Sequence, residues 1–443
     1  MTVSFISLGC AKNLVNTEQM MALVKAAGHT LREDPDGADA AVVNTCGFID
    51  SAKSEAIDQI LALAELKKTG KLGKILVAGC LSQRYQDEIR AELPEIDGLL
   101  GTGSYTDIVK ALEEVQAGGQ PNFFGDIDHT EEEVPRVLAT PRYSAYLKIA
   151  EGCNNHCAYC VIPSLRGRYR SRGMVELLQE AEGLAQSGVK ELIVVAQDIT
   201  RYGTDLCGKR LLPELLEKLC RMDFHWIRLH YLYPDEVDDA LIDVIAREKK
   251  ILNYLDIPIQ HASDRMLKAM NRRGTQADLR VLFQKLREKI PGVVLRTSLI
   301  CGFPGETEED FEELCAFLKA VRIERAGVFP YSREEGSAAY SMPHQVDEDT
   351  VARRVELLID LQSRVMDAYN EERLGGYEEV LCEGFDPEAG CYWGRTYADS
   401  PDIDGRVLFT AGERVQAGQF VWVHITGVED GDLTGEMDEE GRV

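Results

Sequence analysis

The sequence contains no uninterrupted run of the roughly 18 apolar residues that a membrane-spanning helix needs. Its first residues, Met1 to Leu8, lack the basic flank and the cleavage site of a secretory signal peptide. Positive charge is scarce, since 49 Lys and Arg residues stand against 75 Asp and Glu residues, for a net charge of −26. These absences predict a soluble, cytoplasmic protein with no membrane partner. They also argue against direct nucleic-acid binding, which favours a basic patch.

The twelve cysteines are not spaced as in a small secreted disulfide scaffold, and the cytosol keeps thiols reduced. Metal or cluster ligation is therefore the better interpretation for the cysteines that fall in motifs. We expect the other six to be ordinary free thiols: Cys207, Cys220, Cys301, Cys315, Cys382 and Cys391.

The pattern predicts an α/β protein with three regions joined in series. Residues 1–118 alternate apolar β-type runs (3–8, 40–43 and 75–78) with helical stretches (18–27, 51–67 and 83–93), which favours a parallel sheet with helical crossovers. Residues 119–138, with Gly118-Gly119-Gln120-Pro121 and the acidic run Glu131-Glu132-Glu133, are interpreted as a linker.

The second region, residues 139–370, repeats the strand–helix alternation six times, which predicts a partial barrel because a closed one needs eight units. Its candidate strands are residues 146–150, 191–196, 226–231, 254–259, 293–299 and 326–331. The third region, residues 373–441, has short β-type runs separated by turns, as in a small oligonucleotide-binding type of barrel. From Gly375 to Val443 the sequence holds 16 acidic and 4 basic residues, a net charge of −12.

The segment Cys153-Asn154-Asn155-His156-Cys157-Ala158-Tyr159-Cys160 places three thiols directly after a predicted strand. Thiolates suit both zinc and iron–sulfur clusters, but a structural zinc site normally has four protein ligands. His156 is a weak fourth ligand because it is adjacent to Cys157, and no second CxxC pair follows. Three cysteines on four irons leave one iron free. The spacing resembles the signature of the radical S-adenosylmethionine superfamily, in which that iron binds S-adenosylmethionine.

Three further thiols, Cys10, Cys46 and Cys80, each follow a β-type run of the first region. Taken singly, each one is more typical of core filling. If the three strands are parallel neighbours, however, all three thiols emerge at one edge of the sheet. We therefore predict a second cluster there, also with an open iron.

The two triads, the six-unit core and the terminal barrel resemble the radical S-adenosylmethionine methylthiotransferases, whose terminal barrel is called TRAM. Residues 7–14, 226–234 and 254–261 are similar to the enzymes, called RimO, that modify an aspartate of small-subunit ribosomal protein S-twelve. Residues 394–399 with Asp404-Gly405 resemble the TRAM signature. One departure is Ala11, where many members have proline, but this is not a ligand position.

The resemblance implies two 4Fe-4S clusters, with S-adenosylmethionine as radical source and methyl donor. The cluster on Cys153, Cys157 and Cys160 would generate a radical that takes hydrogen from the aspartate β-carbon. The cluster on the other triad would present the sulfur. Such chemistry exceeds side-chain acid–base catalysis, so a cofactor must supply it. The implied partners are ribosomal protein S-twelve, a reductant such as flavodoxin and a sulfur donor.

Weaker signals suggest contacts to S-adenosylmethionine. Tyr159 lies where the family places an aromatic residue near adenine, and Gln197 and Asp198 follow the second strand of the core. The segment 302–307 follows the fifth strand, and Gly302 is expected to approach the cofactor closely. The alternative is that Thr307 only caps the following helix. Arg296, if it faces the barrel interior, needs an anionic partner such as the cofactor or the substrate.

Arg166, Arg168, Arg170 and Arg172 form a basic stretch that is either a solvated loop or a contact with ribosomal RNA or a carboxylate. The main rival function is a tRNA adenosine methylthiotransferase, but a barrel that binds tRNA should be basic. A non-catalytic iron–sulfur electron carrier or sensor is the alternative from another class. Such carriers normally ligate each cluster with four protein side chains.

Overall fold

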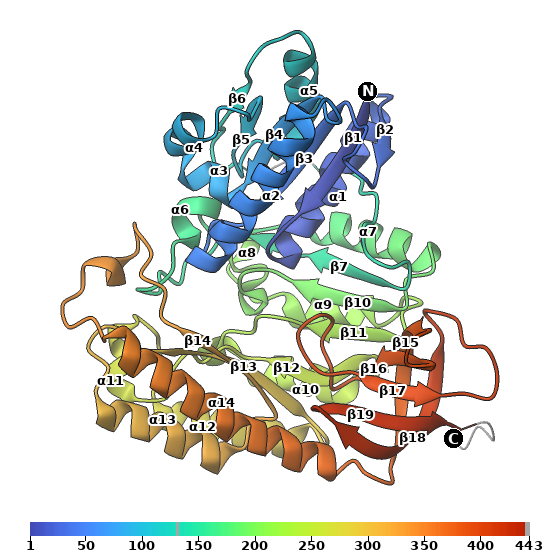
Figure 1. Cartoon of the computed structure of the whole chain (residues 1–443). Helices are drawn as coiled ribbons and strands as arrows, with labels where there is room; N and C mark the ends of the chain where they lie inside the picture. Colours follow the sequence, from blue (N-terminus) through green and yellow to red (C-terminus); the bar gives the residue numbers. More distant parts are fainter. Residues whose placement is uncertain (130–132, 439–443) are drawn as a thin grey trace.

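The computed structural model describes residues 1–129 and 133–438. Glu131 and Glu132 of the predicted linker, and residues 439–441 at the end of the predicted third region, lie outside the described residues. Three bodies of secondary structure follow one another along the chain, from blue through green and yellow to red (Figure 1). Within the described part of the chain, the helices are too short or too polar to cross a membrane.

The first body is a six-stranded parallel sheet with the order β2-β1-β3-β4-β5-β6. Buried apolar clusters cover both of its faces, and every residue of the central strand β3 is buried. The strands are β1 (Thr2–Ser7), β2 (Thr30–Arg32), β3 (Ala40–Thr45), β4 (Lys74–Gly79), β5 (Gly98–Leu100) and β6 (Asn122–Phe123). The helices are α1 (Ala11–Ala26), α2 (Asp50–Lys68), α3 (Cys80–Arg84), α4 (Gln86–Glu92) and α5 (Ile108–Gln116).

Three details of this body differ from the sequence prediction. Helix α1 begins at Ala11 rather than near residue 18, and the predicted helix 83–93 is split at Tyr85 into α3 and α4. Asn122 and Phe123, in the segment interpreted as a linker, pair with β5 and form the edge of the sheet. Each difference involves short or polar stretches, where hydrophobic periodicity is a weak signal.

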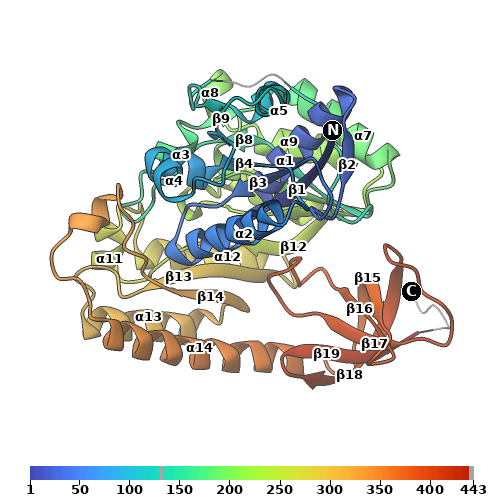
Figure 2. The ribbon, with the colours of Figure 1, turned by 45° about the horizontal axis from the view of Figure 1, so that its top comes forward.

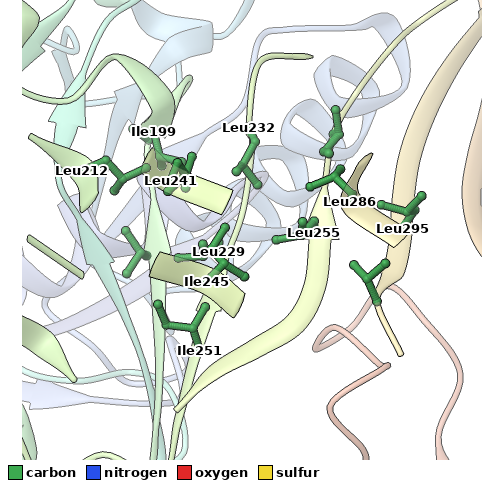
Figure 3. Packing of buried hydrophobic residues seen from close by; sticks show 14 of the residues in the cluster. Ile199, Leu212, Leu229, Leu232, Leu241, Ile245, Ile251, Leu255, Leu286 and Leu295 are labelled. Carbon is green, nitrogen blue, oxygen red and sulfur yellow. The ribbon is translucent and has the colours of Figure 1, made fainter. Parts of the chain in front are cut away.

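The second body is the predicted six-stranded parallel sheet, with the order β7-β10-β11-β12-β13-β14 and its two edge strands unpaired with each other. This confirms a partial barrel of six strand–helix units. Leu229, Leu255 and Leu295 from three of its strands pack together with helix residues such as Leu241 and Leu286 (Figure 3). The strands are β7 (Ser144–Lys148), β10 (Glu191–Val195), β11 (Trp226–Leu229), β12 (Ile251–Asp256), β13 (Val294–Cys301) and β14 (Arg325–Pro330).

Helices surround this sheet, and a two-stranded ribbon of β8 (Ala150–Glu151) and β9 (Arg170–Ser171) extends β7. The helices are α6 (Ile162–Arg166), α7 (Met174–Gln186), α8 (Thr204–Cys207), α9 (Leu212–Leu219), α10 (Asp239–Arg247), α11 (Asp264–Ala269), α12 (Gln276–Lys289) and α13 (Glu308–Val321). Thr307 and Asp310 form a capping box on α13, which confirms the predicted capping role of Thr307.

The third body is a closed barrel with the strand order β15-β16-β17-β19-β18. Helix α14 (Glu348–Glu371), which the sequence analysis did not predict, connects it to the partial barrel (Figures 1 and 2). Closure through the parallel pair β17–β19 confirms the predicted small all-β barrel. The strands are β15 (Tyr377–Asp386), β16 (Cys391–Arg395), β17 (Val407–Thr410), β18 (Phe420–Glu429) and β19 (Asp432–Met437).

Buried polar contacts fix the closed barrel to the partial barrel. Arg395 donates to Glu191 at 2.6 Å, and Arg228 donates to the other oxygen of the same carboxylate at 2.8 Å. All three side chains are at most 3% exposed. Further along the connecting loop, Asp404 accepts from the Tyr254 hydroxyl at 2.6 Å. The third body is therefore docked through an ion network as well as through apolar contacts.

Candidate functional site

All six cysteines of the two predicted triads line one cavity with a volume of about 340 Å³. The cavity lies between the carboxyl edge of the first sheet and the carboxyl edge of the partial barrel. The sequence analysis predicted the edge at which each triad emerges, but it did not predict that the two edges face each other. The residues that line the cavity besides the cysteines include Lys12, Tyr159, Arg166, Gln197, Tyr231, Tyr233, Gln260 and Arg272.

The first triad is built from the ends of three neighbouring strands. Cys10 is the residue before α1, Cys46 follows β3, and Cys80 opens α3 directly after β4. The backbone is tight here, because a Cβ atom at Gly9 would lie 2.6 Å from the Cβ of Cys46. Gly9 also has a φ of +88°, so a larger residue at this position would be strained as well as crowded.

The second triad lies on the loop between β8 and α6. Backbone N–H groups point at its thiols: Asn155 donates to Cys153 Sγ at 3.5 Å, and Ile162 donates to Cys160 Sγ at 3.4 Å. The Arg272 guanidinium lies 3.8 Å from Cys157 Sγ. These groups are hydrogen-bond donors to the three sulfur atoms, which suits sulfur atoms that act as metal ligands.

Arg166 connects the first triad to the barrel. Its guanidinium donates to Cys80 Sγ at 3.4 Å, to the Asn16 side chain at 2.9 Å and to Glu151 at 3.2 Å. It also bonds Asn13, whose amide donates to the Thr45 carbonyl at 2.9 Å. Arg166 is 5% exposed, so this side chain of helix α6 is a buried connection between the sheet edge and the barrel.

The thiols of the two triads differ in acidity. Burial raises the pKa of Cys46 and of Cys153 to about 11 in each case. Burial also opposes ionisation of Cys10, but the charges of Lys12 and Arg166 lower its pKa below the ordinary value. Cys10 is therefore the thiol of its triad that most readily presents a thiolate.

Among the described residues, no three His, Cys, Asp or Glu side chains converge tightly enough to hold a single metal ion. His156, considered above as a fourth zinc ligand, is exposed and does not line the cavity. The two triads instead line the wall of a wider space. Their ligand roles stay a prediction.

Three family models match the chain in the order of its three bodies. They are the uncharacterized protein family UPF0004 over residues 2–101, the radical SAM superfamily over residues 147–318 and the TRAM domain over residues 374–437. A ribosomal protein uS12 methylthiotransferase RimO from Pelotomaculum thermopropionicum is 51% identical, over 98% of each chain. The chain belongs to this family. The RimO of Lachnoclostridium phytofermentans is 48% identical, over 98% of this chain and 99% of its own.

The fold is shared with distant radical S-adenosylmethionine enzymes. The methyltransferase TsrM from Kitasatospora setae superposes with a TM-score of 0.56 at 13% identity, and the match covers 74% of this chain and 72% of that one. At this identity the likeness shows the fold alone. The family membership shows that the chain is a radical S-adenosylmethionine methylthiotransferase, which implies an iron–sulfur cluster and S-adenosylmethionine as its cofactors.

Two of the predicted cofactor contacts line the cavity of the methylthiotransferase. The Tyr159 hydroxyl accepts from Arg272 at 3.3 Å. The Gln197 amide donates to Glu151 at 2.5 Å, while its oxygen is buried and has no hydrogen-bond partner among the described residues. A buried amide oxygen without a partner is costly, so it fits a donor such as the amino group of S-adenosylmethionine.

The other three predicted contacts lie elsewhere. Asp198 caps the turn 199–201 and accepts from Asn155, so its carboxylate is already satisfied away from the cavity. The anionic partner of Arg296 is Asp256, at 2.7 Å, rather than a cofactor or substrate. Gly302 is small because helix α14 passes over it: a Cβ there would lie 2.3 Å from Val351. None of these three residues lines the cavity, and direct cofactor contacts at these positions stay a prediction.

The four arginines of the basic stretch all contact carboxylates of the chain itself, although the Arg168 side chain stays 79% exposed. Arg166 is buried at the first triad, Arg168 and Arg170 pair with Asp128, and Arg172 pairs with Glu180 at 2.6 Å. The physical reason is that an acidic chain provides an intramolecular carboxylate for each of these cations. Of the two hypotheses for this stretch, the carboxylate contact is the one that the structure contains, within the chain itself.

Several cavity residues were missed by sequence reasoning. Lys12 in the cavity, and Glu151 beside it, are each within two residues of a triad cysteine, a signal that was available. Tyr231 and Arg272 reach the cavity from the loop after β11 and the segment after α11. Tyr231 lies in the stretch 226–234 that resembles the family, but neither that stretch nor the sequence around Arg272 shows that the side chain reaches a cavity.

Proposed function

We propose that this methylthiotransferase modifies the β-carbon of an aspartate in ribosomal protein uS12, with 3-methylthioaspartate as the product. The observation that carries the proposal is the single cavity lined by both cysteine triads. Hydrogen removal and carbon–sulfur bond formation must occur at one substrate atom, so their two sources must lie around one space. The names of the relatives support uS12 as the substrate.

We infer that each triad holds one 4Fe-4S cluster: one on Cys153, Cys157 and Cys160, and the other on Cys10, Cys46 and Cys80. Three thiols at each site, rather than four, fit clusters that keep one iron open to a ligand. When bound, these groups together with S-adenosylmethionine supply one-electron bond cleavage and a transferable sulfur. The unpartnered oxygen of Gln197 supports S-adenosylmethionine beside the second triad.

The side chains of the protein provide orientation and exclusion of water. Tyr159, held by Arg272, offers an aromatic face beside the second triad. Glu151 receives Lys148 at 2.9 Å and Gln197 at 2.5 Å, and through these contacts it fixes the Gln197 amide. Burial would raise the pKa of Glu151, but Lys148 and Arg166 lower it well below the usual range, so it accepts at every working pH.

The acidic terminal barrel separates uS12 from the rival substrate, tRNA. Its net charge of −12 from residue 375 onward disfavours phosphate contacts and favours a basic ribosomal protein. The two sites of three thiols each disfavour an electron carrier, because such carriers normally ligate each cluster with four protein side chains. The reaction would take place in the cytoplasm and require a reductant, such as flavodoxin, and a sulfur donor.

The anaerobically reconstituted protein, supplied with S-adenosylmethionine, sulfide and reductant, is expected to add one methylthio group to uS12. Offering uS12 and unmodified tRNA in parallel, with mass spectrometry of both, checks this. A mass gain on the target aspartate alone supports the proposal. A gain on tRNA adenosine alone contradicts it and would invalidate the inference from charge.

A further inference from the structure

Lys12 is a buried cation that points into the cavity. It is the second residue of α1, directly after Cys10 and Ala11, and it is 8% exposed. Its ammonium lies 3.7 Å from the centre of the Tyr231 ring, which belongs to the opposite wall. The side chain therefore extends from the first sheet towards the barrel, across the space that separates the two triads.

The other cations of the cavity have acceptors of their own. Arg166 is paired with Glu151, and Arg272 donates to the Pro258 carbonyl at 2.5 Å and to the Tyr159 hydroxyl at 3.3 Å. For Lys12 the described residues offer the ring and hydroxyl of Tyr231 and the neighbouring Cys10 thiol, but no carboxylate within ion-pair distance. Glu151 acts on it only at longer range. A buried ammonium without a carboxylate is costly unless a ligand supplies the anion.

Hydrogen bonds fix the loop after β11, which carries Tyr231. Tyr231 adopts a φ of +66°, a conformation that is unusual for a bulky residue. Its backbone N–H donates to Asp256 at 3.3 Å, and its carbonyl accepts from the Ile199 N–H at 3.1 Å. Asp256 is in turn paired with Arg296. Such backbone conformations are frequent at ligand-binding sites. The conformation of Tyr231 orients the ring that contacts the Lys12 ammonium.

We propose that Lys12 binds the side-chain carboxylate of the target aspartate and so determines specificity for an acidic residue. This inference rests on the proposed function. The β-carbon that must face both triads is one bond from the carboxylate carbon, so a cation between the triads is placed to hold that carboxylate. A neutral adenine would gain nothing from such a cation, whereas a buried carboxylate requires one.

The test compares Lys12→Met, which removes the charge at similar length, with Lys12→Arg, which keeps it. Lys25→Met, an exposed lysine at the other end of α1, is the matched control. Each holoenzyme receives uS12 carrying a β-deuterated target aspartate. The readouts are iron and sulfide content, cleavage of S-adenosylmethionine, deuterium transfer to 5′-deoxyadenosine and methylthio product.

Lys12→Met is expected to keep its iron and its cleavage activity but to lose deuterium transfer and product by at least about 100-fold, the usual scale for removing one partner of a buried charge pair. Lys12→Arg should retain more of both, and Lys25→Met should match the wild type. Changing the target aspartate to asparagine should lower product formation by the wild type by a similar factor. The same change should lower product formation by Lys12→Met only slightly further.

Three results would overturn the inference. The first is undiminished deuterium transfer in Lys12→Met, and the second is loss of iron in that variant. The third is that combining Lys12→Met with the asparagine substrate lowers product formation by the product of the two separate factors. Failure of the wild type to modify uS12 is a separate result. It would refute the proposed function itself, and this inference with it.

Discussion

Replacing Cys153 by alanine is expected to abolish cleavage of S-adenosylmethionine, whereas Cys46→Ala should keep cleavage and lose only the methylthio product. The reason is that the two triads, although they line one cavity, come from different bodies of the fold. Cys153 belongs to the loop after β8 of the partial barrel, and Cys46 belongs to the edge of the first sheet. With one of three ligands removed, the corresponding cluster would be lost while the other remains.

The measurement is anaerobic formation of 5′-deoxyadenosine beside product mass, with iron content for each variant. Cys207→Ala is the matched control, because Cys207 is an exposed thiol outside both triads, and it should behave as the wild type. Undiminished cleavage by Cys153→Ala would refute the assignment of the radical cluster. Product formation by Cys46→Ala would refute the assignment of the second site.

Glu191→Gln is expected to destabilise the protein by about 3–5 kcal/mol, the usual cost of breaking a buried ion pair by removing one partner. Glu191 is fully buried and accepts from both Arg228 and Arg395. Its loss leaves two buried guanidinium groups without their shared carboxylate. Because Arg395 belongs to the terminal barrel, the effect should appear first as increased hydrogen exchange at the interface of β10 with β16.

Thermal unfolding and hydrogen exchange of both forms measure this effect. Glu217→Gln, which removes the exposed partner of Arg247, is the control and should cost at most about 1 kcal/mol. Burial alone would raise the pKa of Glu191, but Arg395 and Arg228 lower it to about 2. A lowered pKa means that this stabilisation is complete above the unfolded value of about 4.3 and is lost as the pH falls towards 2. Equal unfolding temperatures for wild type and Glu191→Gln would contradict the prediction.

The alternation of apolar runs with helical stretches located nearly all of the sheet that positions the second triad. Each of its six strands was predicted to within a few residues, because buried parallel strands are continuous apolar runs. In the first sheet, β5 and β6 have only three and two residues, which is too short a pattern to predict a strand. Helix α14 was missed although it has 24 residues, and few of these are buried.

The site could be predicted as far as it follows from position along the chain. Cysteines at the ends of successive strands indicate a shared edge, which placed the first triad, and the position of the second triad followed from the strand directly before it. Which way a side chain points could not be predicted in the same way. Arg296 and Asp256 occupy paired positions on β13 and β12, and only that register shows that Arg296 already has a carboxylate. The position of Lys12 beside Cys10 is visible in the sequence, but its direction towards Tyr231 across the cavity is not.

Cationic side chains line the cavity of a molecule whose overall charge is strongly negative. The whole chain carries a net charge of −26, yet Lys12, Arg166 and Arg272 line the cavity, and Glu151 beside it is already neutralised by Lys148 and Arg166. A basic protein is attracted to the exterior, while a carboxylate on that protein is attracted to the interior. With Lys12 as the carboxylate-binding residue proposed above, the substrate would be selected twice: as a basic protein during encounter and as an acidic residue at the reacting position.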